Sequence, residues 1–285
     1  MAGFSTITDY VDCHLNGRTH SCAFRKVPSQ ASTAGWWVDL SMAAGNPMPN
    51  YYVGTELEAT LFDDFRGIFH GDDKDPASKH LCSLSLITPT AAMVGQYKLL
   101  DYLLCYPFID GDSADAQTMN NSITLPRYTS GDGVQVMAVA VAPTTGGGTF
   151  TFDYVNQDGV TKTSKAQTCT LTSANIATLL TSQQANTNCL GPFLRLDSGD
   201  TGVKRINSVT FSVANGGLMA LVLVKPIAEI AIREINTEVE ATYIDKRPAI
   251  LPRIYDGAYL NLISNPAGSV AAGILKGAAS FVWST

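Results

Sequence analysis

Hydrophobic and polar positions alternate most clearly in the second half of the chain. In residues 149–156 the aromatic side chains of Phe150, Phe152 and Tyr154 alternate with polar ones, and this period of two predicts a half-buried β-strand. An Asp-Gly turn follows directly, as expected for a hairpin. Further apolar runs recur at roughly ten-residue spacing, separated by Gly, Asn and Asp. Residues 121–232 are therefore predicted to form an antiparallel β-sandwich, jelly-roll-like or immunoglobulin-like.

The residues before this sandwich follow no single period. Residues 5–15 predict a short helix with Ser5 as its N-cap, and residues 36–40 predict a strand. Residues 54–70 fit a helix or a strand equally well. We therefore predict an irregular α/β region over residues 1–120.

The last part of the chain, residues 233–285, changes character again. Its segment 247–252 contains two prolines, which exclude a long helix because proline fixes φ and lacks a donor. Residues 259–263 and 280–283 are predicted to be closing strands. We expect this C-terminal extension to return to the sheet or to reach a neighbouring subunit, with 245–257 as an extended arm. The predicted fold class is mainly β.

The amino-acid composition indicates what covers the surface of the folded chain. Of the 285 residues, 45% are hydrophobic and only 15% are charged, so the chain can bury a large core but has little charge to cover its surface. Such a surface suits a subunit that neighbours cover. The net charge is −6 and no basic patch is evident, so we expect no direct binding of nucleic acid.

Targeting and redox features point to the cytosol as the place of synthesis. The first residues lack the basic and apolar regions of a signal peptide, and the apolar runs near 218–232 and 258–283 are interrupted by charges and prolines, so no membrane span is expected. Six cysteines occur without any CxxC spacing, and we expect them to be mostly reduced.

One group of residue types could in principle bind zinc. Cys13, His14, His20 and Cys22 offer the sulfur and nitrogen ligands that zinc favours. Adjacent ligands at 13 and 14 are poorly placed for one tetrahedral ion, and the usual ligand spacings are absent. We therefore predict no metal site and interpret these residues as surface histidines and partly buried thiols.

Two acidic stretches could in principle bind a cation. Asp72, Asp73 and Asp75 begin like a calcium loop, but the sixth position is Ala77 where the pattern requires glycine. A second stretch fails the same pattern: Asp110, Asp112 and Asp115. We favour hydrated acidic loops, with a loosely held cation as the alternative.

No enzymatic motif is found. The chain has no G-x-S-x-G, H-E-x-x-H or phosphate-binding loop, so we predict no catalytic residue, no cofactor and no enzyme activity. A glycan hydrolase would need two carboxylates facing each other across a cleft. Neighbouring acids in one loop do not supply that arrangement: Asp63, Asp64, Asp72 and Asp73.

Four aromatic residues allow two interpretations. Trp36, Trp37, Tyr51 and Tyr52 could form a platform for a receptor or glycan, or could pack in a core or an interface. We favour packing, because it is the commoner use of such side chains.

Several segments together carry a family resemblance. They are Leu-Pro-Arg-Tyr-Thr-Ser-Gly-Asp-Gly-Val at 125–134, Tyr-Val-Asn-Gln-Asp-Gly at 154–159, Gly-Pro-Phe-Leu-Arg-Leu-Asp-Ser-Gly-Asp-Thr-Gly-Val at 191–203, Ser-Val-Thr-Phe at 208–211, Leu-Pro-Arg-Ile-Tyr-Asp-Gly at 251–257 and Phe-Val-Trp at 281–283. With these motifs the chain resembles a family of virion structural proteins of tailed bacteriophages. The likeness covers most of the chain and consists of strand and turn patterns.

The resemblance implies a non-enzymatic virion component made in the host cytoplasm. It suggests a capsid cement or decoration protein that stabilises the head by bridging subunits of the major capsid protein. The alternative is a tail, head-tail or fibre component that binds a host receptor or glycan. Homo-oligomers are expected, with a trimer as one arrangement, alongside contacts to other virion proteins and none to nucleic acid or membrane. The family offers no catalytic residues to transfer.

Overall fold

The fold is mainly β, as predicted. The computed structural model describes residues 4, 6–62, 64–169, 174–180, 191–244 and 251–284. Strands account for 45% of the chain and helices for 7%. The strands form three sheets, and the paired strands in each are antiparallel, which confirms the predicted sandwich-like class.

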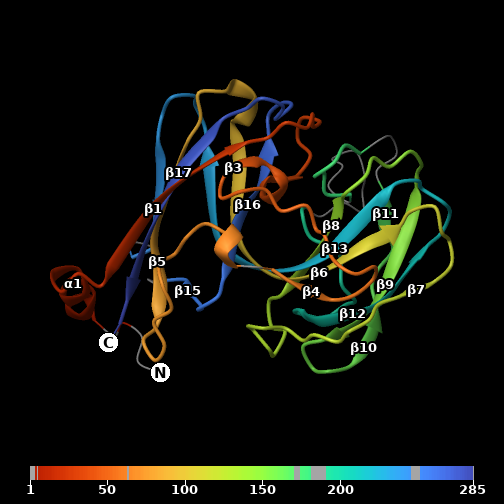
Figure 1. Cartoon of the computed structure of the whole chain (residues 1–285), viewed down its shortest axis with the longest axis horizontal. Helices are drawn as coiled ribbons and strands as arrows, with labels where there is room; N and C mark the ends of the chain where they lie inside the picture. The colour runs from red at the N-terminus through yellow and green to blue at the C-terminus, as the bar shows by residue number, and fades with distance from the viewer. Residues whose placement is uncertain are drawn as a thin grey trace.

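Two long strands join the two lobes of the molecule (Figure 1). These are β6 (Gly95–Asp110) and β13 (Leu218–Ile232), which pair with each other along their whole length. They form the middle of a central sheet with the order β2-β16-β6-β13-β8, in which β4 also pairs with β6. The other strands of this sheet are β2 (Val38–Asp39), β4 (Thr60–Leu61), β8 (Gln135–Ala140) and β16 (Tyr259–Pro266).

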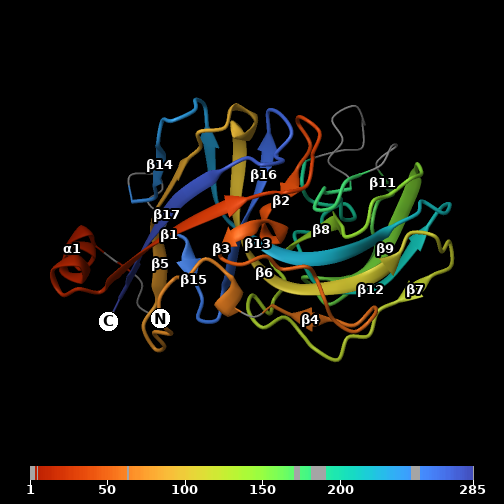
Figure 2. The same cartoon turned by 45° about the horizontal axis from the view of Figure 1, so that its top comes forward.

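The first lobe is built from both ends of the chain. Its own sheet has the order β14-β5-β17-β1-β3, and β15 also pairs with β5. Strands β1 and β17 come from opposite ends of the chain and lie side by side (Figure 2). The bounds are β1 (Thr19–Val27), β3 (Ala44–Asn46), β5 (Lys79–Ile87), β14 (Val239–Thr242), β15 (Arg253–Ile254) and β17 (Leu275–Trp283). Residues 1–120 and 233–285 thus share one sheet.

The second lobe contains most of the region 121–232. Its sheet has the order β10-β9-β12-β7, and β11 also pairs with β9. The hairpin predicted after the aromatic strand is present, because β10 pairs with β9 across the Asp-Gly turn. The bounds are β7 (Gln117–Thr118), β9 (Gly148–Asn156), β10 (Thr161–Thr163), β11 (Gln167–Cys169) and β12 (Val203–Phe211).

Two apolar cores lie on opposite faces of the central sheet. Along β13, Val222 and Val224 face the core of the first lobe, while Leu221 and Leu223 face that of the second. A sheet covered on both faces needs no polar face, so its strands are continuous apolar runs. This arrangement explains why the segment around β6 shows no clear period in the sequence.

The predicted N-terminal helix is present as α1 (Ile7–Leu15). Its N-cap is Thr6, one residue after the predicted Ser5, which lies outside the described residues. Asp9 N donates to Thr6 Oγ1 (3.2 Å) and Thr6 N donates to Asp9 Oδ2 (3.0 Å), a complete capping box. Cys13 fixes the helix to the sheet, because its Sγ donates to the carbonyl of Trp283 (3.1 Å).

Two other local expectations need correction. The strand predicted at 36–40 is only the two-residue β2, because Asp39 caps the amide of Ser41 and starts the 3₁₀ turn η1 (Leu40–Met42). The ambiguous residues 54–70 form neither a long helix nor a long strand. They contain β4 and the 3₁₀ turn η2 (Asp64–Arg66), while another short turn, η3 (Ala91–Met93), precedes β6.

A lysine is fully buried in the first lobe. Lys26 has 0% of its surface exposed, and its Nζ donates to the carbonyls of Pro47 (2.9 Å) and Ala43 (3.3 Å). Burial lowers the pKa of this ammonium to about 8, and the nearby charge of Asp39 only partly opposes that effect.

This burial predicts a pH-dependent stability that Lys26→Met should abolish. An unfolded lysine keeps its proton up to about pH 10.4, whereas Lys26 loses it near pH 8 in the folded state, so the unfolded chain binds more protons between these values. The free energy of unfolding should therefore rise by about 2 kcal/mol from pH 7 to pH 9.5 through this residue. Urea denaturation of both proteins at several pH values measures the difference.

Comparison of the two proteins removes a competing effect. Buried thiols such as Cys105, whose pKa burial raises to about 12, lower the stability above pH 9 in both proteins alike. The difference between wild type and Lys26→Met therefore isolates the lysine. Identical pH profiles for the two proteins would show that Lys26 titrates as it does in the unfolded chain.

Candidate interaction surface

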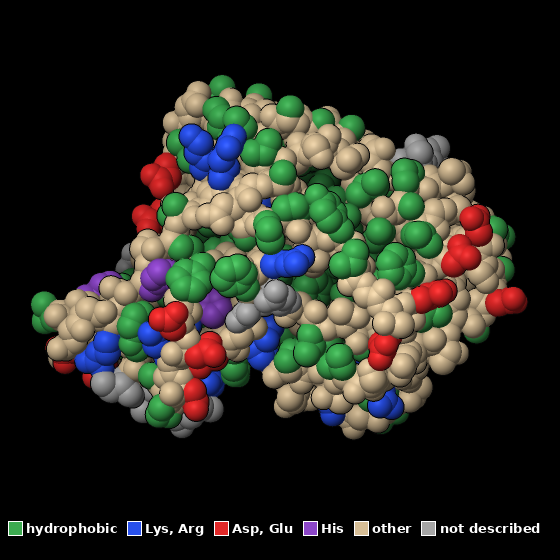
Figure 3. Space-filling view, viewed as in Figure 1, with side chains coloured by type: hydrophobic (Ala, Val, Ile, Leu, Met, Phe, Trp, Pro, Cys, Tyr) green, Lys and Arg blue, Asp and Glu red, His purple; other side chains and the backbone are tan. Residues whose placement is uncertain are grey.

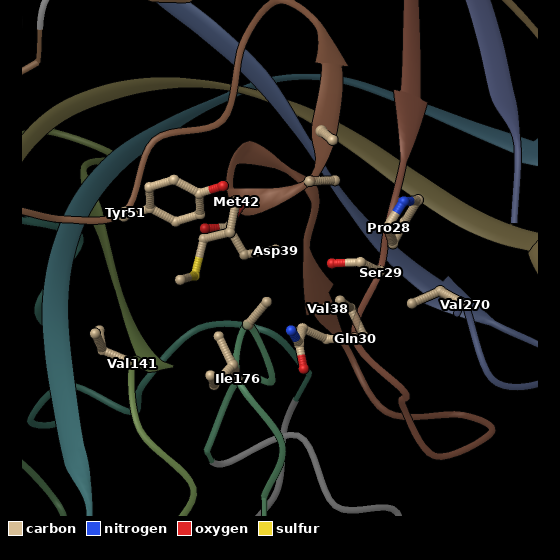
Figure 4. A pocket seen from close by; sticks show the side chains of 13 residues that line it. Pro28, Ser29, Gln30, Val38, Asp39, Met42, Tyr51, Val141, Ile176 and Val270 are labelled. Atoms are coloured by element: carbon tan, nitrogen blue, oxygen red, sulfur yellow. The ribbon is translucent and has the colours of Figure 1, made fainter. Parts of the chain in front are cut away.

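A pocket is lined by residues from separate parts of the chain (Figure 4). Its volume is about 230 Å³ and its walls are mostly apolar. Figure 4 shows Met42 and Tyr51 on one side, and Val141 and Ile176 on another. The first two residues belong to the first lobe, and Val141 directly follows β8 of the central sheet. The pocket is therefore a hollow at the junction of separate parts of the chain.

The carboxylate in this pocket is fully engaged by the protein itself. Asp39 is 1% exposed. Its Oδ1 accepts hydrogen bonds from Ser41 N (2.8 Å) and Tyr102 OH (2.7 Å). Its Oδ2 accepts from Ser41 Oγ (2.7 Å) and from Tyr52 OH. Burial raises the pKa of Asp39, and these hydrogen bonds oppose the rise. Through these hydrogen bonds Asp39 links Ser41, Tyr52 and Tyr102 to one another. The carboxylate is therefore a structural anchor.

Beside the pocket, the segment between β3 and β5 exposes large apolar side chains. Six of them, between residues 48 and 69, are 46–88% exposed. Figure 3 shows hydrophobic side chains gathered across the middle of this face, between the lobes. We call this set the apolar loop surface: Met48, Tyr51, Val53, Leu61, Phe65 and Phe69. Contiguous patches of exposed apolar side chains mark contact sites on soluble proteins, and Tyr51, Val53 and Leu61 lie beside pockets.

The apolar loop surface combines projections with hollows. Tyr51 lines the first pocket, whereas Val53 and Leu61 line a second pocket of about 200 Å³. The second pocket also contains Arg66 and Tyr259. Protruding side chains next to small pockets are the shape that buried interface cores require. The arrangement can hold another protein by packing, with one arginine at its margin.

The four aromatic residues considered as a platform are not displayed together. Trp37 is 5% exposed and Tyr52 is 1% exposed, and both belong to the core of the first lobe. Trp36 is half-buried, and Tyr51 is exposed. The structure thus separates the four residues and leaves one of them, Tyr51, on the apolar loop surface.

The acidic loop that resembled a calcium site holds the protein's own ammonium group. Lys79 is buried, and its Nζ donates to the carbonyls of Asp72 (2.9 Å) and Gly71 (3.2 Å) and to Nδ1 of His70 (2.9 Å). The same Nζ lies 3.7 Å from Oδ1 of Asp256. Burial lowers the pKa of Lys79, and Asp256 opposes that shift. The lysine therefore satisfies the carbonyls that a bound cation would otherwise use.

The four residues that could bind zinc make separate packing contacts. Cys13 is the buried residue of α1 and packs with Cys82 and Val282, and the ring of His14 packs against Tyr10 with centroids 4.6 Å apart. His20 packs against Phe69 at 5.0 Å, and Cys22 is half-buried. No group of three or more metal-ligating side chains occurs among the described residues.

The other candidate acids take structural or surface positions. In the second acidic stretch Asp110 Oδ1 accepts from Asp112 N (2.9 Å), which closes a turn, and Asp115 is exposed. Asp63 and the side chain of Asp64 lie outside the described residues, and Asp72 and Asp73 are exposed.

Two further observations concern the chain as a whole. Within the described part of the chain, no helix has the length and apolar character needed to cross a membrane. Four cysteines are free thiols: Cys13, Cys22, Cys82 and Cys105. The side chain of Cys169 and all of Cys189 lie outside the described residues.

Comparisons with known proteins leave the family open. No family model matches the chain, and no curated protein matches it. Among solved structures, the chain is similar to one of infectious bursal disease virus, Gt strain, with 9% identity and a TM-score of 0.17 over 93% of this chain and 80% of that one. T=1 particles derived from the same virus give 10% identity and a TM-score of 0.17 over 93% and 77%. Likeness at this level carries no argument about function.

Proposed function

We propose that this chain is a non-enzymatic structural subunit of a virus particle, and that neighbouring subunits cover much of its surface. The apolar loop surface carries this proposal, because three of its exposed side chains, Tyr51, Val53 and Leu61, line pockets. The low share of charged residues, 15%, supports it. Covering such side chains removes apolar area from water, which is the main favourable term in protein association.

We propose more specifically a capsid cement or decoration protein of a tailed phage, which bridges subunits of the major capsid protein. The resemblance of its sequence motifs to those of virion proteins of tailed phages supports this assignment. In this role, shape complementarity and apolar burial would hold adjacent capsid subunits together against the internal pressure of the DNA. Each bridging molecule adds contacts that must break before the capsid can open.

Charges placed on the apolar loop surface should prevent incorporation into particles. In the double variant Tyr51→Asp/Val53→Asp, two carboxylates would have to be buried without partners in the contact. We expect at least a tenfold loss of copies per particle, about 1.4 kcal/mol or more. Since both side chains are exposed, the unfolding free energy of the free chain should change by less than about 1 kcal/mol. Quantitative mass spectrometry of purified particles measures the incorporation.

A matched control is available in the second lobe. Val160, which follows the hairpin turn before β10, is 50% exposed, so Val160→Asp makes the same chemical change away from the proposed contact. This variant should be incorporated like the wild type. Normal incorporation of the double variant would contradict the proposed contact surface.

Particles that lack the chain should be less resistant to heat and to low salt. Adding the purified wild-type chain should restore the resistance, whereas Tyr51→Asp/Val53→Asp should not. The temperature of DNA release from the particles, followed with a DNA-binding dye, is the readout. Equal resistance with and without the chain would argue against a stabilising role.

A further inference from the structure

Among the described residues, one strand of the first lobe has no strand partner on one of its edges over much of its length. On one side β1 pairs with β17 from Thr19 to Lys26, without a register shift. On its other side it pairs with β3 only at residues 25–27. Residues 19–24 therefore have a strand partner on one side only, within the part of the chain that the structure describes.

The direction of the free backbone groups follows from the pairing. Trp283 N donates to Arg18 O (3.2 Å), so residue 18 and the following even-numbered residues of β1 bond to β17. The carbonyl of Arg25 instead points at Gly45 of β3. By the same alternation, Thr19, Ser21 and Ala23 direct their N–H and C=O groups toward the open side. The side chains of Ser21 and Ala23 are exposed.

This edge lacks the features that usually prevent pairing with another chain. Residues 19–24 contain no lysine, no proline and no bulge. The second half of β13, which extends beyond β8, contrasts with it. That stretch carries Lys225, Pro226, a register shift and the exposed Glu229. The chain therefore protects one extended strand end and leaves β1 open, which is the condition for strand addition.

The free stretch of β1 is complementary to itself. In an antiparallel pair centred on Ser21, residue 21 faces its own copy, Thr19 faces Ala23, and His20 faces Cys22. No like-charged side chains oppose each other there. The chain leaves the sheet before Arg18 at one end and meets β3 at the other, so two copies offer free edges of matching length.

We propose that a second copy of this chain adds its own β1 to this edge, antiparallel and across a two-fold axis, so that two first-lobe sheets become one continuous sheet. This inference deepens the proposed function, since it names a contact between copies of the subunit. Main-chain hydrogen bonds supply the affinity, and the small residues Ser21 and Ala23 allow the backbones to approach. The contact is a dimer contact, separate from the apolar loop residues Tyr51 and Val53.

Ser21→Pro tests the contact without disturbing the fold. Proline removes an N–H that points to solvent in the single chain, and edge strands accept proline at such positions. In the dimer the same change removes the two central N–H···O bonds. We expect sedimentation equilibrium to show a dimer for the wild type and at least a tenfold weaker dimer for Ser21→Pro. Ser21→Lys, which places two ammonium groups opposite each other across the axis, should weaken the dimer as well.

Thr210→Lys is the matched control, because Thr210 is an exposed residue of β12 in the second lobe. Its dimer should be as strong as that of the wild type. Hydrogen exchange provides a second readout, in which the amides of Ser21 and Ala23 should become protected as the protein concentration rises. A wild type that stays monomeric with these amides in fast exchange, or a Ser21→Pro and a Ser21→Lys that both dimerise normally, would overturn the inference.

The outcomes separate this inference from the proposed function. If Ser21→Pro and Ser21→Lys dimerise like the wild type while Tyr51→Asp/Val53→Asp still fails to enter particles, the two-fold contact is wrong and the structural role stands. If the β1 variants lose the dimer but the chain is absent from particles, the contact is right and the virion role fails.

Discussion

Replacing Asp39 by alanine is expected to lower the free energy of unfolding by about 3–5 kcal/mol. The carboxylate accepts hydrogen bonds from the hydroxyls of Tyr52 and Tyr102, both of which are buried. It also accepts from the amide and the hydroxyl of Ser41, which start the 3₁₀ turn after β2. Alanine would leave these buried donors without an acceptor and open a cavity between β2 and β6. Urea denaturation at pH 7 measures the loss.

Asp112→Ala serves as the control, because Asp112 is exposed in the turn after β6. We expect its stability to stay within about 0.5 kcal/mol of the wild type. If Asp39→Ala lost less than about 1 kcal/mol, the carboxylate would not be the anchor that its hydrogen bonds describe.

The second large effect is expected for Arg127→Met. Nη2 and Nε of Arg127 donate to Oδ1 (2.7 Å) and Oδ2 (2.9 Å) of Asp101, a two-pronged ion pair. Asp101 is 1% exposed, and burial raises its pKa to about 6 even though the guanidinium opposes the rise. Removing the arginine leaves a buried carboxylate without its cation, which should cost about 3–5 kcal/mol at pH 8.

The cost of Arg127→Met should become smaller in acid. A carboxyl group whose pKa is raised in the folded state holds its proton where the unfolded chain has lost it, so its contribution to stability declines as pH rises from about 3.9 toward 6. Without Arg127 the pKa of Asp101 rises further, and the decline continues to higher pH. The difference between variant and wild type should therefore be largest at pH 8 and shrink by pH 5, as urea denaturation at both values would show.

Arg195→Met is the matched control, since Arg195 is exposed in the second lobe. It should change stability by less than about 0.5 kcal/mol at either pH. A cost of Arg127→Met that is the same at pH 8 and pH 5 would mean that Asp101 stays charged, or stays neutral, throughout this range.

The β class of the fold could be predicted because its exposed strands keep their period. The alternating residues around Phe150 and Phe152 form β9, and the Asp-Gly turn connects β9 to β10 in a hairpin. The two-lobed arrangement could not be predicted in the same way. Residues of β6 such as Leu99 and Leu103 are buried by different cores, and a strand buried on both faces has no period to detect.

The candidate surface was harder to predict than the fold. An apolar residue such as Tyr51 or Val53 has the same signature in a sequence whether it is buried or exposed, and only the packed lobes show which it is. The role of Lys79 could not be predicted from the sequence either. A lysine at the start of an apolar strand gave no sign that it would occupy the carbonyls of the acidic loop around Asp72.

A density map of intact particles from an infected host would test the central idea most directly. We predict that the chain is part of the particle, with Tyr51 and Val53 packed against another protein subunit and the pockets beside them filled by its side chains. A particle without this chain, or one in which the apolar loop surface faces only solvent, would contradict the proposal that this surface exists to be covered.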